Sequence, residues 1–385
     1  MTSPRILHIA DDEKFINGAN YLFDRAFPGS NTFVIIMPPR KREPRYVDPK
    51  PNFIFEPKSP KIIQKLLTLS AAYDVVILHK VDRLKGALLL QSDEPEKFMG
   101  IIFGAEVFNS NIMGDDYLGE KTRKLAEGIR EKTIMGYAKE FYGKIRYRKI
   151  HDLYRDVSIE EVLNRLSCFG SVTENAYDDY YKKGILRSKK TLIPFTYYPL
   201  EFIIKDPELR ANGPHILLGN SASATNNPVE AIDRLSESDL KDRKVFVPLC
   251  YGDRRYAKEI IKYGRDRLGK NFKPLLKFMP LEEYNRVISR CGVVIMNHQR
   301  SQAFGNVIAS LYMGARVYLN DTDLYRYFTG LGCHVYLIEN ESMDLNKFLT
   351  QLEPEKIEEN RIIIEQGLST EELTKRIKAK IYNPI

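Results

Sequence analysis

A short apolar stretch near the middle of the chain leads into a glycine and a run of small polar residues. The stretch 215–219 (HILLG) is followed by Asn220 and Ser221, and a helix is expected to begin near Asn227. Small residues let backbone amides approach phosphate oxygens, and a helix N-terminus adds partial positive charge. The segment is therefore a candidate phosphate-binding loop. An ordinary strand-to-helix loop explains the spacing equally well, because the dinucleotide fingerprint GxGxxG is absent.

A second polar loop follows the buried run 293–296 (VVIM). Arg300 and Gln302 lie in this loop, and Gly305 and Asn306 open the helix expected after it. Polar residues at the carboxyl end of a buried strand are where open α/β sheets bind ligands. A solvated loop is the simpler alternative for this segment. Two further expected strand ends carry Tyr251-Gly252-Asp253 and Met279, so four strand ends would meet at one edge of a sheet.

The first half of the chain offers acidic and basic residues after its own expected strands. Asp11 and Asp12 follow the first strand, His79 and Lys80 follow the run DVVILHK, and Glu106 lies in FGAEVF. A carboxylate at such a position can act as a general base toward a hydroxyl group. We expect Asp12 or Glu106 to be that base. We expect Asp11, His79 and Lys80 to contact the molecule that carries this hydroxyl group. A lone carboxylate is more often a helix cap or a solvated charge.

Strands and helices alternate along the chain, which predicts parallel sheets covered by helices. In the first half we expect strands at 5–9, 32–36, 74–78, 98–103 and 166–169, and helices at 14–26, 59–72, 117–154 and 175–182. In the second half we expect strands at 215–219, 244–249, 275–278, 293–296, 316–319 and 334–337, and helices at 227–236, 255–268, 281–291, 303–313, 323–330 and 354–380. The proline-rich stretch 38–53 is expected to be a loop.

A chain of 385 residues suits two domains of ordinary size. The run Ile193–Phe202, which is punctuated by prolines, is the best candidate for the connection between them. We therefore expect an N-terminal domain at 1–198, a C-terminal domain at 199–352, and C-terminal helices at 353–385 that pack back on the N-terminal domain. Ligands should lie between two such domains.

Net charge is +8, which favours an anionic partner. Between Lys121 and Arg155 there are eleven Lys or Arg and four Asp or Glu, a local excess of +7. Aromatic residues are interleaved with these charges, a pattern that suits an anionic membrane surface. Nucleic acid is the alternative, but no recognition motif accompanies the segment. A solvated helix face is the simplest reading.

Other compositional features exclude several classes of protein. No run of about 18 apolar residues is present, so a spanning helix is not expected. The N-terminus lacks the apolar region of a secretory signal, which predicts a cytoplasmic protein. Four scattered cysteines without a CxxC pair argue against a disulfide framework and against a zinc site.

Several segments together resemble the bacterial 4-acetamido-4,6-dideoxygalactosyltransferase family of enterobacterial common antigen synthesis. They are LLGNSASATNNP, VPLCYGD, FMPLEEYNRVISRC, HQRSQAFGNVIASLYMGARVYLN and FGAEVF. The resemblance covers roughly residues 5–340 and is strongest over 219–320. It departs from better-known members in HIADDEKF, in the insert 37–58, and in FGAEVF, which stands in place of a WGAD-type motif.

The resemblance implies a GT-B fold of two Rossmann-like domains that face each other across a cleft. In such a fold we expect the N-terminal domain to bind the acceptor and the C-terminal domain to bind the nucleotide sugar. It also implies a dTDP-sugar donor and an undecaprenyl-diphosphate-linked saccharide as acceptor at the inner face of the cell membrane, with no cofactor and no obligatory metal. The residues expected to bind the donor are Gly219, Asn220, Ser221, Tyr251, Gly252, Asp253, Met279, Tyr284, Arg300, Gln302, Gly305 and Asn306. The alternatives are a sugar-nucleotide epimerase on the same fold, or a nucleic-acid-binding protein that uses residues 121–155.

Overall fold

The chain forms two compact units that are interleaved in sequence. The computed structural model describes residues 3–41, 43–104, 117–131, 147–171, 173–188, 190–195, 197–237, 239–338 and 349–382. Unit 1 comprises Met1–Gly114, Met135–Pro199 and Thr370–Ile385, and unit 2 comprises Asp115–Ile134 and Leu200–Ser369. The chain passes from unit 1 to unit 2 between Pro199 and Leu200, one residue after the boundary predicted between residues 198 and 199. The structure differs from the prediction in assigning residues 115–134 and 353–369 to unit 2.

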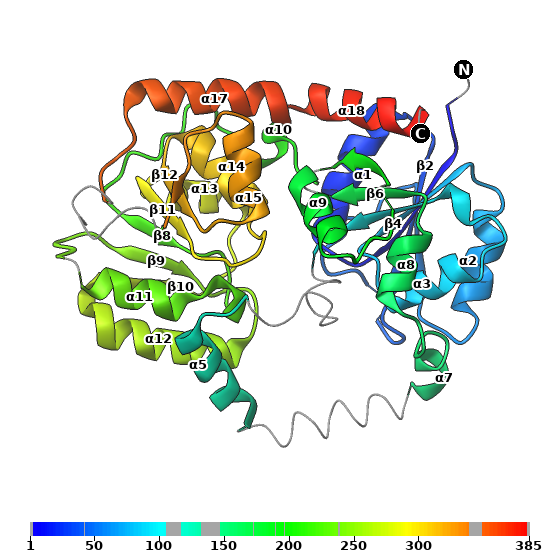
Figure 1. Cartoon of the computed structure of the whole chain (residues 1–385), viewed down its shortest axis with the longest axis horizontal. Helices are drawn as coiled ribbons and strands as arrows, with labels where there is room; N and C mark the ends of the chain where they lie inside the picture. Colours follow the sequence, from blue (N-terminus) through cyan, green and yellow to red (C-terminus); the bar gives the residue numbers. More distant parts are fainter. Residues whose placement is uncertain are drawn as a thin grey trace. The chain divides into compact units, whose positions relative to one another are not determined.

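Unit 1 is built on a parallel sheet of seven strands in the order β3-β2-β1-β4-β5-β6-β7 (Figure 1). The strands are β1 (Ile6–Asp11), β2 (Asn31–Met37), β3 (Phe53–Pro57), β4 (Val75–His79), β5 (Phe98–Ile102), β6 (Cys168–Ser171) and β7 (Thr191–Pro194). The central strands β1, β4 and β5 are mainly apolar and buried along almost their whole length, as expected for strands covered on both faces.

Helices connect and cover this sheet. They are α1 (Ile16–Ala26), α2 (Ile62–Ser70), α3 (Arg83–Leu90), α7 (Arg148–His151), α8 (Ile159–Arg165), α9 (Glu174–Lys182) and the C-terminal α18 (Thr370–Tyr382), with a short η1 (Pro95–Lys97). The helices α2, α3 and α8 pack in one row, and α18 packs against α1 and β7. The last segment of the chain therefore completes the unit that contains the first.

Unit 2 repeats the design with a parallel sheet of six strands in the order β10-β9-β8-β11-β12-β13. The strands are β8 (Ile216–Leu218), β9 (Val245–Pro248), β10 (Phe272–Leu275), β11 (Val293–Met296), β12 (Arg316–Leu319) and β13 (Tyr336–Leu337). The helices are α5 (Glu120–Glu131), α10 (Leu200–Ile203), α11 (Pro228–Ser236), α12 (Arg254–Leu268), α13 (Leu281–Ser289), α14 (Phe304–Met313), α15 (Asp323–Gly330) and α17 (Pro354–Leu368), with short turns η2 (Ala224–Asn226) and η3 (Gly269–Asn271).

Each sheet has one point at which the order of connection reverses. In unit 1 it lies between β1 and β4, and in unit 2 it lies between β8 and β11. Loops on either side of such a point separate at the carboxyl edge of the sheet, which is where open α/β folds bind ligands. Four of the loops that the sequence singled out, those after β1, β4, β8 and β11, flank the two reversal points.

Several predicted elements need correction. The strand predicted at 275–278 is β10 at Phe272–Leu275, because Phe272 is buried against β9 whereas Phe278 is 77% exposed. The stretch 38–53 is irregular up to its last residue, where β3 begins. The strand β7 and the helices α3 and α8 were not predicted. Of the helix predicted at 117–154, the structure describes α5 and α7, and residues 132–146 lie outside the described residues.

Candidate functional site

The loop that follows β8 is folded around the side chain of Asn226, which is 2% exposed. Asn226 Oδ1 accepts a hydrogen bond from the backbone N–H of Asn220 (2.8 Å), and its Nδ2 donates to Ser221 Oγ (3.1 Å) and to the carbonyl of Ser223 (3.2 Å). Gly219 has φ 67°, and a Cβ there would lie 2.7 Å from Asn226 Oδ1. Both the backbone conformation and the close contact require glycine. The loop is thus held in one shape before any ligand binds.

Asn226 also joins this loop to the one that follows β11. His298 Nε2 lies 2.9 Å from Asn226 Oδ1. Because the Nδ2 of Asn226 donates to two oxygens, its Oδ1 faces the histidine, and His298 must carry its proton on Nε2. Burial and, to a smaller extent, the charge of Arg300 lower the pKa of His298 to about 3. The imidazole is therefore neutral, and its hydrogen bond to Asn226 links the two loops.

Gln302 makes a second link across the reversal point. Its Nε2 donates to Asn220 Oδ1 (3.1 Å), and its Oε1 accepts from Thr225 Oγ1 (2.7 Å). The predicted residues Gly219, Asn220, Ser221 and Gln302 are therefore brought together by the fold, as neighbours in one hydrogen-bonded cluster.

The first turn of α14 adds backbone donors to the same edge. Ala303 precedes the helix with φ 65°, and no side chain caps the helix N-terminus. The first amides of an α-helix have no acceptor within the helix, so those of Gly305 and Asn306 are available to an anion. A Cβ at Gly305 would meet only Ile203 Cδ1, at 3.9 Å, so the glycine leaves open space at the start of this helix.

The loop after β9 is joined to the first loop by backbone hydrogen bonds. The amide of Ala222 donates to the carbonyl of Tyr251 (2.6 Å), and the amide of Asp253 donates to the carbonyl of Ala222 (3.0 Å). Gly252 has φ 116°, and a Cβ there would lie 2.5 Å from the Ala222 carbonyl oxygen. The Tyr251 side chain is 46% exposed at this edge. Three predicted strand ends therefore meet at one edge of the sheet.

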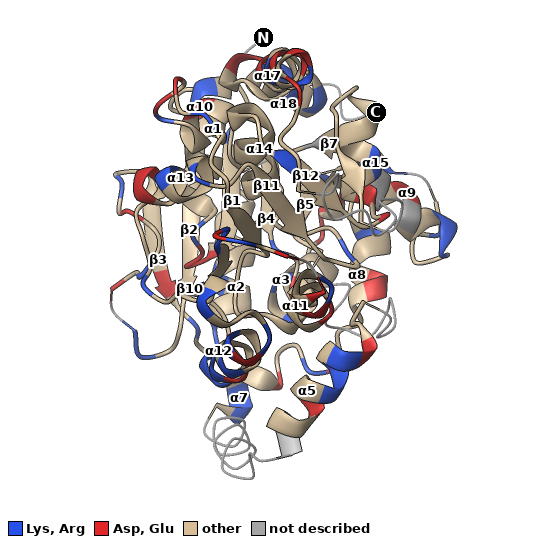
Figure 2. Ribbon diagram, turned by 90° about the vertical axis from the view of Figure 1, so that its left-hand side faces the viewer, with Lys and Arg blue, Asp and Glu red and all other residues tan. Residues whose placement is uncertain are grey.

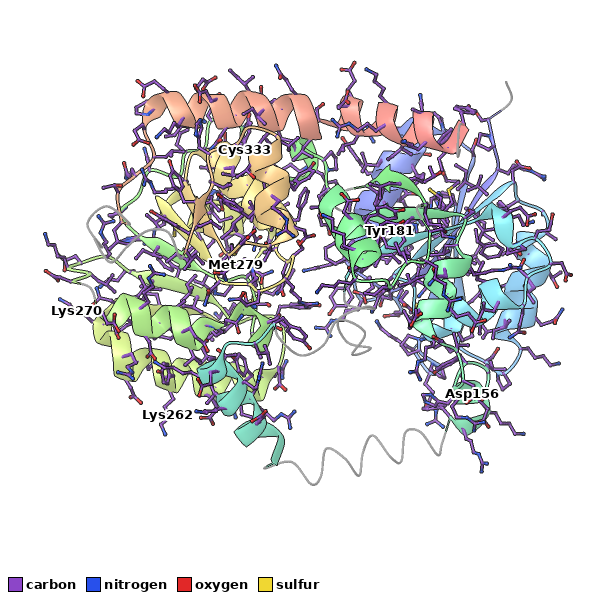
Figure 3. The ribbon with its side chains drawn as sticks, in the orientation of Figure 1. Asp156, Tyr181, Lys262, Lys270, Met279 and Cys333 are labelled. Carbon is purple, nitrogen blue, oxygen red and sulfur yellow. The ribbon has the colours of Figure 1, made fainter. Side chains whose placement is uncertain are left out.

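Three of the side chains predicted to bind the donor have other surroundings. The carboxylate of Asp253 accepts from the backbone N–H of Arg255 (2.7 Å), so it caps α12. Met279 lies in the segment between β10 and α13 (Figure 3). The hydroxyl of Tyr284 is buried and has no hydrogen-bond partner among the described residues, and burial raises its pKa. None of the described hydrogen bonds joins Met279 or Tyr284 to the cluster around Asn226.

Asp12, a predicted general base in unit 1, anchors a loop. It accepts from Lys41 Nζ (2.5 Å) and from the backbone amides of Arg45 (2.7 Å), Tyr46 (2.9 Å) and Val47 (3.2 Å). These donors hold its pKa below the ordinary value even though desolvation opposes them. A carboxylate with four donors has no lone pair left for a substrate proton, so the contacts favour a structural role.

Asp11 belongs to a buried ion cluster at the reversal point of unit 1. The Lys85 side chain is fully buried, and its Nζ lies 2.8 Å from Asp11 Oδ2 and 3.2 Å from Asp82 Oδ2. Desolvation opposes ionisation of both groups, but the two carboxylates raise the pKa of Lys85 and the nearby lysines lower that of Asp11. Lys80 pairs with Glu13 (2.8 Å) beside this cluster. The predicted Asp11 and Lys80 are thus neighbours.

His79, which was predicted to contact the acceptor, is instead a core residue that is 1% exposed. Its Nε2 lies 2.9 Å from His8 Nδ1, and its Nδ1 lies 3.2 Å from the hydroxyl of Tyr197. Asn31 Nδ2 donates to two backbone carbonyls, so its Oδ1 accepts from His8 Nε2 (3.2 Å). The chain of donors therefore runs from Tyr197 through both histidines to Asn31, and burial lowers the pKa of both imidazoles. Glu106 lies outside the described residues.

The basic segment 121–155 is divided between the two units, and several of its described charges are paired. Lys121 pairs with Asp233, Lys124 with Glu120 (2.6 Å), and Arg155 with Asp152 (3.2 Å). The aromatic residues at 137, 141 and 142 lie outside the described residues. The described part is therefore no continuous basic helix face.

Sequence reasoning missed the asparagines that build the site in unit 2. Asn226 and Asn227 precede Pro228 at the start of α11, and Asn227 has φ 44°. Asparagine tolerates this left-handed conformation, and proline suits the first position of a helix. The triplet Asn-Asn-Pro was the available signal. A cavity of about 400 Å³ lies at the opposite, amino-terminal edge of the same sheet, lined by residues that include Asp239, Lys241 and Asn271.

Comparison with known proteins indicates the class of reaction. Residues 163–337 match the family described as 4-alpha-L-fucosyltransferase, glycosyl transferase group 56. The chain is a glycosyltransferase. No curated protein matches the sequence significantly. None of the described helices is long and apolar enough to cross a membrane.

Solved structures show that its fold is GT-B. Sucrose-phosphate synthase from Thermosynechococcus elongatus superposes with TM-score 0.65 at 10% identity, covering 98% of each chain. HepE from Anabaena, in complex with UDP and glucose, superposes with TM-score 0.62 at 11% identity over 98% of this chain and 99% of that one. A glycosyltransferase from Rickettsia africae gives TM-score 0.60 at 11% identity over all of both chains. The predicted GT-B fold with two Rossmann-like domains is therefore confirmed.

Proposed function

We propose that this glycosyltransferase moves a 4-acetamido-4,6-dideoxyhexose-type sugar from a dTDP-sugar to an undecaprenyl-diphosphate-linked saccharide. In this proposal unit 2 holds the donor and unit 1 holds the acceptor. The transfer would serve the synthesis of a surface polysaccharide or antigen.

The observation that carries the donor assignment is the cluster at the reversal point of unit 2. Asn226 holds the loops after β8 and β11 together, through Asn220 and His298, at 2.8 and 2.9 Å. The loop after β11 leads directly into the uncapped N-terminus of α14. The backbone amides of this first helical turn are already oriented, and such amides stabilise the charge that develops on a departing diphosphate. Arg300 lies in the second loop and can supply a positive charge to the same group.

The proposed identity of the sugar rests on two likenesses of overlapping parts of the chain. The motifs between residues 219 and 320 resemble transferases of 4-acetamido-4,6-dideoxygalactose, and residues 163–337 match a fucosyltransferase description. Fucose and the dideoxy sugar share a methyl group at C6, so both likenesses indicate a 6-deoxyhexose. HepE, one of the similar structures, was solved with UDP. A nucleoside diphosphate is thus the leaving group that we assign to this chain.

The proposed base is Glu106, because the contacts of Asp12 occupy its carboxylate. A base would take the proton of the attacking acceptor hydroxyl as the bond to the anomeric carbon forms and the bond to the diphosphate breaks. Asp11 and Lys80 are proposed to position the acceptor.

Contact with an anionic membrane is part of the proposal, because the acceptor is lipid-linked. In the described structure the strongest support comes from α12 in unit 2 rather than from residues 121–155. Four exposed cations recur along one stripe of this helix, with no ion pair or side-chain hydrogen bond described for any of them, and Figure 2 shows the basic colouring of the helix. They are Arg254, Lys258, Lys262 and Arg265.

Donor binding is tested by calorimetry with dTDP in the presence and absence of EDTA. Ser221→Ala and Asn306→Ala should each weaken binding, and EDTA should not change it. Ser289→Ala is the matched control, because its hydroxyl donates only to Arg286 at the end of α13, away from the cluster. Loss of binding in EDTA, or unchanged affinity in both site variants, would contradict the donor assignment.

Catalysis is tested by turnover of Glu106→Gln. Loss of a general base should lower turnover by about 10²–10⁴-fold. The affinity for dTDP should stay at the wild-type value, because the donor is held by the other unit. Turnover within a few-fold of wild type would remove Glu106 from the mechanism.

Membrane contact is tested by co-sedimentation with vesicles of phosphatidylglycerol and phosphatidylcholine. Each engaged Lys or Arg contributes about 1 kcal/mol near an anionic surface. Lys258→Glu with Lys262→Glu should therefore reduce binding strongly. Lys50→Glu with Lys378→Glu changes the net charge equally at exposed positions elsewhere and is the control. Equal loss in both double variants would show that only net charge matters.

A further inference from the structure

A segment from the first half of the chain packs beside the donor loops of unit 2. We call residues 117–131 the arm; it contains α5, which lies beside α11 and α12 (Figure 1). Its docking site is a row of polar residues spaced three apart at the start of α11, namely Asn227, Glu230 and Asp233. This spacing places the three side chains along one side of the helix.

Glu230 and Asp233 hold the helical part of the arm. Glu230 accepts from the backbone N–H of Thr122 (2.9 Å) and from its hydroxyl (2.6 Å), and Thr122 is fully buried. Lys121 pairs with Asp233. A Cβ on Gly119 would lie 2.2 Å from Glu230 Oε1, so a larger residue here would displace the carboxylate that binds Thr122. The arm is therefore seated by specific contacts.

Asn227 holds the arm and the donor loop at the same time. Its Oδ1 accepts from the amide of Gly119 (2.8 Å), and its Nδ2 donates to the carbonyls of Tyr117 (3.1 Å) and Asn297 (3.1 Å). The Nδ2 of Asn297 donates back to the carbonyl of Asn227 (2.8 Å). Asn297 is the first residue after β11, and Asn320 fixes its other side (3.0 Å). One fully buried side chain thus sets the arm against the loop that carries Arg300.

Tyr117, the first residue of the arm, lies against that arginine. The Cζ of Arg300 is 5.8 Å from the centre of the Tyr117 ring, within the range of cation–π attraction. We propose that Tyr117 and Asn227 are positioning residues for Arg300, so that the arm completes the donor site of unit 2. The proposal rests on the proposed function, in which Arg300 binds the donor diphosphate.

Positioning of this kind raises affinity by lowering the cost of ordering Arg300 when the donor binds. A guanidinium on a long side chain has many rotamers in water, and the ring and the anchored loop reduce them. Cation–π contacts contribute about 0.5–2 kcal/mol. Loss of the Tyr117 ring should therefore weaken dTDP binding between about 2-fold and about 30-fold at 1.4 kcal/mol per tenfold.

The experiment is a double-mutant cycle on dTDP affinity in the full chain, measured by calorimetry. Tyr117→Leu should weaken binding in the wild-type background and should have no further effect in Arg300→Ala, because the ring acts through the arginine. Tyr117→Phe keeps the ring and the backbone carbonyl and should restore wild-type affinity. A merely structural role for the ring would give the same loss in both backgrounds, which would overturn the proposal.

The control is Lys124→Gln, on the exposed side of the arm, which should leave affinity unchanged. Thermal midpoints of all variants separate local effects from unfolding. Gly119→Ala is a second variant that disturbs the seat of the arm without altering Tyr117 or Arg300, and it should also weaken dTDP binding. If the wild-type chain fails to bind dTDP, the proposed function is wrong; if it binds and both arm variants bind equally well, only this inference is wrong.

Discussion

Removal of the Asn226 side chain should separate the two loops of the donor site. In Asn226→Ala the amide of Asn220 and the Nε2–H of His298 lose their shared acceptor, at 2.8 and 2.9 Å. Both groups are at the base of the loops, and His298 is 3% exposed. A water molecule that enters the space left by the amide would replace part of the lost hydrogen bonding.

The expected cost follows from the number of donors left without a partner. A buried donor without an acceptor costs about 1–3 kcal/mol. Two such donors, with partial rescue by water, should lower the free energy of unfolding of unit 2 by about 3 kcal/mol. At roughly 2–4 °C per kcal/mol for a unit of this size, its thermal midpoint should fall by about 6–12 °C. Affinity for dTDP should fall at a temperature where the variant is still folded.

Calorimetric unfolding and dTDP titration measure the two effects separately. Asn271→Ala is the matched control, because Asn271 Nδ2 also donates two hydrogen bonds, to the carbonyls of Lys241 and Arg243, at the opposite edge of the same sheet. That variant should lose some stability and keep its dTDP affinity. If Asn226→Ala binds dTDP as tightly as the control does, the cluster around Asn226 does not form the donor site.

Three further predictions concern stability. The free energy of unfolding should fall as pH drops below about 6.5, by up to about 1.4 kcal/mol per pH unit for each of the buried histidines His8, His79 and His298. The reason is that these side chains bind protons in the unfolded state but not in the folded state. Urea titrations that give equal stability at about pH 7.5 and about pH 5.5 would contradict this. Lys85→Met should destabilise unit 1 by about 3–5 kcal/mol, because it leaves the carboxylates of Asp11 and Asp82 without their buried ammonium partner. Lys65→Met, which removes an exposed ion pair, should cost under about 1 kcal/mol in the same urea titration. Asp12→Asn should speed proteolysis at residues 41–47; unchanged proteolysis with a large loss of turnover would instead restore Asp12 as a base.

The alternating elements of unit 2 were predictable because each short apolar run ends in a polar or glycine-containing loop. The exception shows the limit of this signal. The runs at 272–275 (FKPL) and 275–278 (LLKF) each contain one lysine among mostly apolar residues, and only pairing with β9 decides between them: Phe272 is buried and Phe278 is exposed. In unit 1 the strand β7 was missed because its four residues carry no periodic pattern of their own.

The candidate site was predictable only as far as local sequence reaches. Strand ends and glycines identified the loops after β8, β9 and β11. The residues that join those loops are held by partners far along the chain, as Asn227 is by Gly119, 108 positions away. The same reason explains the error at His79, which follows the pattern of a strand-end ligand but is covered by Tyr197, 118 positions away. No sequence pattern of one segment contains such a pairing.

The interleaving of the two units sets an order for synthesis on the ribosome. The helix α18, which packs against α1 and β7, is the last described element to be made. Unit 1 is therefore incomplete, with the surface of α1 and β7 that α18 covers still exposed, until all of unit 2 has been translated. The growing chain must keep its first strands from aggregating through most of its synthesis, and a stop codon placed between the two units would leave neither of them complete.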